Sequence, residues 1–284
     1  MTFIFYGMEM SPPCTSVTIA MRLAKVQYEY KVIDLMKKAH LNPDFLKINP
    51  NHTGMLLKLA IWVGGSEIGY HTESAAKVVL VNFPIQILFF LVPTINDNGF
   101  VIWESRAIMQ YVFNRYSPES SLYPSDPMQR AKVDSLLNYG LCKISCFKDY
   151  TFELWPIIYG LQNRTNILDQ GSFYETVSAY IYNSLGIRAG KRDDPVEKKN
   201  FWDQVQFIED HLLKDNQTFL TGNTMTIADI SLGISMSMPM VYLGDKCYKK
   251  FPKITTWRGE LMKVPEYAEG KGFNISLDLP FHKF

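Results

Sequence analysis

The stretch VPTINDNGFVIWESRAI, residues 92–108, decides the fold. Thr94–Asn96 and Phe100–Trp103 each predict a short strand, since both are rich in residues that suit a sheet. Between them, Asp97-Asn98-Gly99 offers residues that accept the positive φ angles of a tight turn, which predicts a β-hairpin. Residues 104–116 then repeat apolar side chains at helical spacing. The stretch therefore predicts strand, turn, strand and helix without a gap.

The residues before this stretch predict alternating strands and helices. Residues 2–6 form a short apolar run typical of a buried strand. The sequence Ser-Pro-Pro at 11–13 is a strong helix start, because serine suits the N-cap and proline the first helical position. Residues 28–34 alternate as a second strand, and residues 43–48 suit a short helix. The resulting order, strand–helix–strand–helix–hairpin–helix, is thioredoxin-like.

The residues after the stretch predict a second, helical domain. SPESSLYPSDP, residues 117–127, has the Ser/Pro-rich composition of a linker. In TMTIADIS, Thr226 predicts a helix N-cap, and Asp229 three residues later completes a capping box. We expect an α/β thioredoxin-like domain over residues 1–117 and an all-α domain over residues 125–284.

Composition and charge exclude several classes of function. A net charge of +1 without any Lys/Arg block argues against a nucleic-acid partner. The four cysteines and few histidines have no spacing typical of disulfide frameworks or zinc sites, so we expect no metal. The apolar run over residues 78–92 is shorter than the roughly 20 residues of a membrane span. The first residues, MTFIFYGMEMSPP, carry no basic leader, so we expect a cytoplasmic protein without a membrane span.

Several separate stretches together resemble the cytosolic glutathione S-transferases, most closely the insect delta/epsilon type. In chain order these stretches are SPPC (11–14), LNPDFLKINPNHT (41–53), VPTINDNGFVIWESRAI (92–108), SLYPSDPMQRAKVDSLLNY (121–139) and TMTIADISL (224–232). The resemblance implies a glutathione-binding N-terminal domain. It also implies a helical domain that carries a hydrophobic substrate pocket and the contacts of a homodimer.

Two segments interrupt this resemblance. In the family NPNHT runs directly into VPT, whereas here 38 residues (54–91) stand between them. A further 29 residues (140–168) break the first long helix of the second domain; without both segments, 284 − 38 − 29 leaves 217 residues, a usual size for the family. Both segments begin with Gly and end with Leu, and the next residue is Val92 or Asp169. A Gly codon GGT contains the GT of an intron's donor site. A Leu codon TTA followed by a codon that starts with G contains the AG of its acceptor site. We interpret both as translated introns. Natural loop insertions are the alternative, because surface loops tolerate length at modest entropic cost.

The resemblance implies conjugation of reduced glutathione, as co-substrate, to hydrophobic electrophiles, a reaction that detoxifies xenobiotics. The delta/epsilon pattern assigns to Ser11 the stabilisation of the glutathione thiolate. It assigns glutathione binding to His52, Val92, Pro93, Glu104, Ser105 and Arg106. It assigns the hydrophobic-substrate pocket to Met10, Tyr174, Val177 and Tyr182.

The residues themselves leave other interpretations open. Ser11 also suits a purely structural N-cap, and Cys14 suits packing, since S-P-P-C lacks the first thiol of a redox C-x-x-C pair. The pocket residues also have the spacing of a helical core. A non-catalytic relative that binds glutathione or hydrophobic ligands is the alternative function. The two inserted segments add a third interpretation, an inactive chain.

Overall fold

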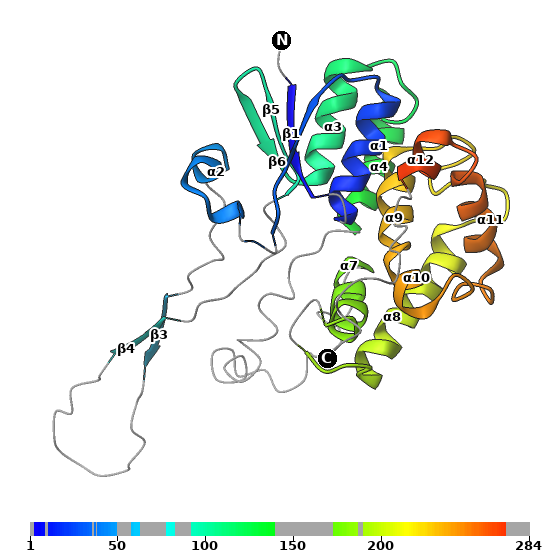
Figure 1. Ribbon diagram of the computed structural model, residues 1–284. Helices are drawn as coiled ribbons and strands as arrows, with labels where there is room; N and C mark the ends of the chain where they lie inside the picture. Colours follow the sequence, from blue (N-terminus) through cyan, green and yellow to red (C-terminus); the bar gives the residue numbers. More distant parts are fainter. Residues whose placement is uncertain are drawn as a thin grey trace, which may run out of the picture.

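The computed structural model describes residues 3–8, 11–35, 37, 39–49, 58–62, 78–82, 92–139, 173–186 and 190–270. A four-stranded sheet with the order β2-β1-β5-β6 organises the N-terminal half (Figure 1). Its strands are β1 (Phe3–Gly7), β2 (Glu29–Val32), β5 (Thr94–Asp97) and β6 (Phe100–Trp103). β1 runs parallel to β2 and antiparallel to β5, and β5 and β6 form the predicted hairpin. This mixed sheet confirms the thioredoxin-like class.

The helices of this half begin close to where the sequence predicts. α1 (Pro12–Leu23) starts at Pro12 with Ser11 in an extended N-cap conformation. α2 (Pro43–Ile48) has the side chain of Asn42 as its cap, accepting a hydrogen bond from the backbone N–H of Asp44 at 3.0 Å. A single 3₁₀ turn (Ala39–Leu41) precedes α2.

Two predicted elements are shorter in the structure. α3 (Ser105–Tyr116) starts one residue later than predicted, because Glu104 has φ 71° and ψ 111°, which no helix accommodates. β2 is four residues long instead of seven, since its partner β1 ends at Gly7, whose carbonyl accepts the last bond between the two segments from Ile33 N at 2.8 Å.

The β5–β6 hairpin is fastened to α3 through the carboxylate of Asp97. This buried carboxylate accepts hydrogen bonds from the hydroxyls of Tyr111 and Tyr116, both at 2.6 Å, and from Asn98 at 2.7 Å. Burial alone would raise the pKa of Asp97, but these donors outweigh it and lower the pKa below its ordinary value. The hairpin therefore sits on α3 in one defined position.

A second sheet lies within the segment 54–91. β3 (Lys58–Trp62) and β4 (Val78–Asn82) form an antiparallel ribbon, with Lys58 opposite Asn82 and Trp62 opposite Val78. Neither strand joins the four-stranded sheet, where β5 fills the place between β1 and β6. Figure 1 shows the ribbon extending away from that sheet. The apolar segment therefore leaves the register of the main sheet intact.

The described residues after 126 are mostly helical, as predicted, with turns and loops between the helices. The helices are α4 (Pro127–Tyr139), α7 (Phe173–Thr176), α8 (Pro195–Phe207), α9 (Ile227–Ser235), α10 (Met238–Leu243), α11 (Pro252–Leu261) and α12 (Pro265–Gly270). π-helical stretches, Val177–Tyr182 and Ile208–Leu212, continue α7 and α8. In the described parts of the chain, no helix is both long and apolar enough to cross a membrane.

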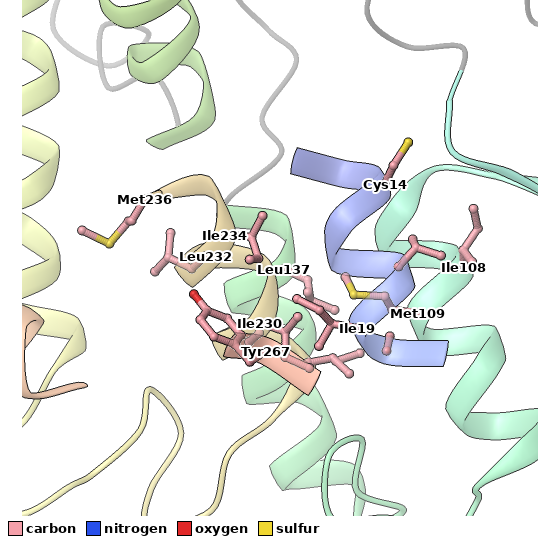
Figure 2. Close-up of a cluster of buried hydrophobic side chains, with 14 of the residues drawn as sticks. Cys14, Ile19, Ile108, Met109, Leu137, Ile230, Leu232, Ile234, Met236 and Tyr267 are labelled. Carbon is pink, nitrogen blue, oxygen red and sulfur yellow. The ribbon is translucent and has the colours of Figure 1, made fainter. Parts of the chain in front are cut away.

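The two halves share a hydrophobic core around α1. α1 packs against α3 on one side and against α9 and α12 on the other. Figure 2 shows Ile19 of α1 among Met109 of α3, Ile230 of α9 and Tyr267 of α12, and all four are buried. Burying one such aliphatic side chain contributes about 1.5 to 3 kcal/mol. The core therefore couples the sheet-bearing half to the helical half.

The predicted cap of α9 carries the densest buried polar contact of the helical half. Asp229 is fully buried, and its Oδ2 accepts hydrogen bonds from the backbone N–H of Thr226 at 2.8 Å and from its hydroxyl at 2.9 Å. Its Oδ1 accepts from the backbone N–H of Leu220 and from the indole Nε1 of Trp257, both at 2.9 Å. One carboxylate thus joins the start of α9 to the preceding loop and to α11.

We predict that Asp229→Ala destabilises the protein by about 3 to 5 kcal/mol, because several buried donors lose their acceptor at once. Urea unfolding followed by circular dichroism measures this change. Asp203→Ala is the control, since Asp203 is an exposed carboxylate that pairs with Lys199 on the surface of α8. An exposed pair contributes about 0.2 to 1 kcal/mol. Equal losses in the two variants would contradict the prediction.

Candidate active site

Sheet topology brings three segments to one end of the four-stranded sheet. Tyr6 near the end of β1 lies opposite Thr94 at the start of β5, and Thr94 lies opposite Trp103 at the end of β6. At this same end of the sheet, the chain therefore leaves β1 toward Ser11, enters β5 from Pro93 and leaves β6 toward Glu104. Below, "this edge" means this end of the strands. Polar groups that are far apart in the sequence are gathered there.

Ser11 stands at the N-terminus of α1 with its side chain not engaged in capping. Its backbone is extended (φ −88°, ψ 117°), and its side chain makes no capping hydrogen bond. Its backbone N–H donates to Met8 O at 3.0 Å, and its carbonyl accepts from Thr15 N at 2.9 Å. The backbone therefore holds Ser11 in place, while its half-buried side chain lies at the positive end of the helix dipole and hydrogen-bonds the Cys14 thiol.

Cys14 is part of the scaffold below Ser11. Its side chain is buried, and its Sγ accepts a hydrogen bond from the backbone N–H of Met8 at 3.4 Å. Burial raises the pKa of the Cys14 thiol to about 11, against smaller opposing effects of Ser11 and Met8. A thiol with this pKa stays protonated at neutral pH, which agrees with the packing role expected for Cys14.

The second and third segments place backbone groups at the same edge. The Val92–Pro93 peptide bond is cis, and Val92 is buried. Glu104 has a positive φ angle, which a non-glycine residue adopts rarely, and such conformations cluster at functional sites. Ser105 is buried, and it is the first residue of α3. Its hydroxyl and backbone N–H therefore lie at a helix N-terminus, where anions are stabilised.

Arg106 connects this edge with the helical half. Burial lowers the pKa of the guanidinium to about 10, while the nearby Tyr174 and Glu104 act in the opposite direction. A pKa of about 10 keeps the group positively charged at neutral pH. Since Tyr174 belongs to α7, the start of α3 and the start of α7 lie close together.

The structure separates the predicted pocket residues by exposure. Val177 and Tyr182 are buried in the core, whereas Tyr174 is only partly buried. The rings of Tyr174 and Tyr182 meet edge to face with centroids 6.3 Å apart. Burial, with Tyr174 as a smaller cause, raises the pKa of Tyr182 well above its ordinary value. Residues 177–182 are π-helical, a conformation found frequently at functional sites.

Two predicted site residues, His52 and Met10, lie outside the described residues.

The sequence reasoning missed another polar contact at this edge. Asn49, directly after α2, donates from Nδ2 to Thr94 Oγ1 at 3.0 Å, and both side chains are fully buried. Both residues belong to stretches that carry the family resemblance, but no local pattern pairs them.

The described residues include no group of three or more His, Cys, Asp or Glu side chains placed to hold a metal ion. The site as described consists of hydroxyl, backbone and guanidinium groups. Such groups suit an anionic, hydrogen-bonding ligand.

Comparison with known proteins agrees with this architecture in both halves. The family model for the N-terminal domain of glutathione S-transferases matches residues 10–114, and that for the C-terminal domain matches residues 172–269. The glutathione S-transferase D7 of Anopheles gambiae is 25% identical over 273 residues, which cover 96% of this chain and 90% of that protein.

Solved structures of insect proteins show the same fold. A delta-class glutathione transferase of Nilaparvata lugens is 26% identical with a TM-score of 0.63, covering 94% of this chain and 92% of its own. Glutathione transferase E6 of Drosophila melanogaster has a TM-score of 0.66 at 24% identity. The match covers 97% of this chain and 94% of that chain. With family models matching the sheet-bearing half and the helical half in the same order, this chain belongs to the glutathione S-transferase family.

Proposed function

We propose that this chain is a glutathione transferase that joins the sulfur of reduced glutathione to hydrophobic electrophiles. The observation that carries the proposal is the position of Ser11. Its hydroxyl lies at the N-terminus of α1, makes no capping bond, and shares one sheet edge with Pro93 and Ser105. A purely structural N-cap serine would use its hydroxyl to cap the helix.

The proposed role of Ser11 is to stabilise the thiolate form of glutathione. A free thiol has a pKa of about 8.5, so that only a few per cent is ionised at neutral pH. Lowering the pKa by about 2 units requires roughly 2.7 kcal/mol. A hydroxyl donor to a charged acceptor supplies about 1.5 to 3 kcal/mol, and a helix N-terminus adds about 0.3 to 1 kcal/mol. Together these contributions match the requirement.

The remaining contacts follow from the charges of the tripeptide. Glu104 would accept hydrogen bonds from the α-ammonium group of glutathione, and Ser105 with Arg106 would bind the γ-glutamyl carboxylate. The backbone of Val92 would pair with the cysteinyl unit as an added strand does. His52 would bind near the glycyl end.

In the reaction, the thiolate sulfur attacks the electrophilic carbon of the second substrate. A carbon–sulfur bond forms, the leaving group departs with its electron pair, and the thiol proton has already passed to solvent. Tyr174 is the best-placed contact for the electrophile, because it is partly exposed beside Arg106. Val177 and Tyr182, being buried, would shape the pocket by supporting Tyr174, and Met10 would line its other side.

We further infer that the domains divide as expected, with the glutathione half over residues 1–117 and the helical half over residues 125–284. The family resemblance supports a homodimer that acts in the cytoplasm. Size-exclusion chromatography with light scattering measures the oligomeric state directly.

We predict that Ser11→Ala lowers kcat by about 10- to 100-fold, the loss of one hydrogen bond to a charged sulfur. Glutathione affinity should change less than threefold, because the carboxylates and ammonium group keep their contacts. Conjugation of glutathione to a chlorodinitrobenzene gives kcat, and calorimetry gives the affinity. Ser16→Ala is the control, since the hydroxyl of Ser16 is buried inside α1, where it donates to Pro12 O. Unchanged kcat in Ser11→Ala would remove Ser11 from the catalytic role.

We predict that Cys14 resists alkylation in the folded chain. With a pKa of about 11, less than about one thiol in a hundred is ionised at pH 8, and the side chain is buried. Iodoacetamide labelling followed by peptide mass spectrometry should leave Cys14 unmodified until urea unfolds the chain. Rapid labelling in the native state would instead indicate a reactive, redox-capable thiol.

A further inference from the structure

We propose that the buried hydrogen bond between Asn49 and Thr94 is a clamp that assembles the glutathione site across the inserted segment 54–91. The inference rests on the proposed function and adds positioning residues to it. Asn49 directly follows α2, before the insertion, and Thr94 is the first residue of β5, after the insertion.

The geometry of the contact suits a clamp. The Nδ2 of Asn49 donates to the Oγ1 of Thr94 at 3.0 Å, and both residues have 0% exposure. Thr94 directly follows Pro93 and lies opposite Trp103, which directly precedes Glu104. The bond therefore connects α2 to the strand ends that carry the proposed glutathione contacts.

α2 depends on tertiary contacts with the rest of the domain. It is six residues long, too short to be stable without them. Contacts between this region and the sheet include the Asn49–Thr94 bond and the edge-to-face packing of Phe45 on Tyr6, with centroids 5.8 Å apart. Figure 1 shows α2 beside the sheet, with the β3–β4 ribbon farther from it.

The insertion is what makes the clamp necessary. Asn49 and Thr94 are 45 residues apart. The segment 54–91 contributes 38 of these, and without it the separation would be 7. Since the probability of bringing two chain points together falls roughly as the 3/2 power of their separation, closure is about 16-fold less favourable with the segment present. A separation of seven positions by itself keeps Asn49 and Thr94 close together. At a separation of 45 positions, a direct contact is needed to do so.

The inserted ribbon does not replace that contact. β3 and β4 pair only with each other, and the described sheet pairs provide no link from them to β1, β5 or β6. The Asn49–Thr94 bond therefore remains the contact that joins the two sides of the insertion.

The test compares Thr94→Val in the full chain and in a variant that joins Thr53 directly to Val92. In the full chain we expect Thr94→Val to weaken glutathione binding about tenfold and to change kcat at saturating glutathione less than twofold. In the shortened chain the same substitution should weaken binding less than twofold. Thr94→Ser keeps the acceptor and should restore binding. Thr255→Val removes a hydroxyl from remote α11 and should leave binding unchanged.

Equal losses in the full and shortened chains would overturn the clamp while leaving the proposed function in place. Binding by the shortened chain but not by the full chain would overturn it as well, because the clamp would then fail to assemble the site. Absence of glutathione binding in both parent chains would instead refute the proposed function.

A second measurement uses the full chain alone and needs no ligand. Hydrogen–deuterium exchange of residues 43–49 should accelerate in Asn49→Leu and in Thr94→Val, and the double variant should accelerate by less than the sum of the two single effects, since both substitutions remove the shared bond. Acceleration in the double variant equal to the sum of the two single effects would show that the two side chains act independently, and would overturn the clamp.

Discussion

The burial of α1 on two sides is the constraint on which the rest of the structure depends. One side of this helix packs against α3 beside the sheet, and the other packs against α9 and α12 of the helical half. Its interior side chains, such as Val17 and Ile19, are fully excluded from water. The helix therefore cannot shift without opening the core that joins the two halves. Its N-terminus, with Ser11, gains a fixed position from packing, which the catalytic role proposed for Ser11 would require.

Three ionisable side chains are buried in the same structure, and their surroundings differ. The carboxylates of Asp97 and Asp229 are surrounded by donors, and each holds several elements together. Arg106 is different, because burial dominates its surroundings and lowers its pKa to about 10. A guanidinium in that setting would gain from a further anionic neighbour, and the carboxylate of glutathione has the charge and the planar shape to supply it.

The segment 54–91 illustrates how a sheet can survive an insertion. Strand β5 keeps its place between β1 and β6, and the inserted strands pair with each other. Register in the main sheet is set by the buried faces of its own strands, with Phe5 and Ile95 fully buried. An insertion that carries its own pairing partner does not compete for those positions. This holds whether the segment arose as a translated intron or as a natural loop.

The sequence by itself determined the local elements: the Asp-Asn-Gly turn, the Ser-Pro start of α1 and the Thr226–Asp229 cap. Each depends on φ angles and hydrogen bonds between residues a few positions apart, so that residue type suffices. Family resemblance added Ser11 and Glu104–Ser105–Arg106 as site residues. Only the tertiary structure decided that Asn49 meets Thr94 and that Arg106 lies near Tyr174. These residues are separated by 45 and by 68 positions, and sheet register and helix packing bring them together, which no local pattern encodes.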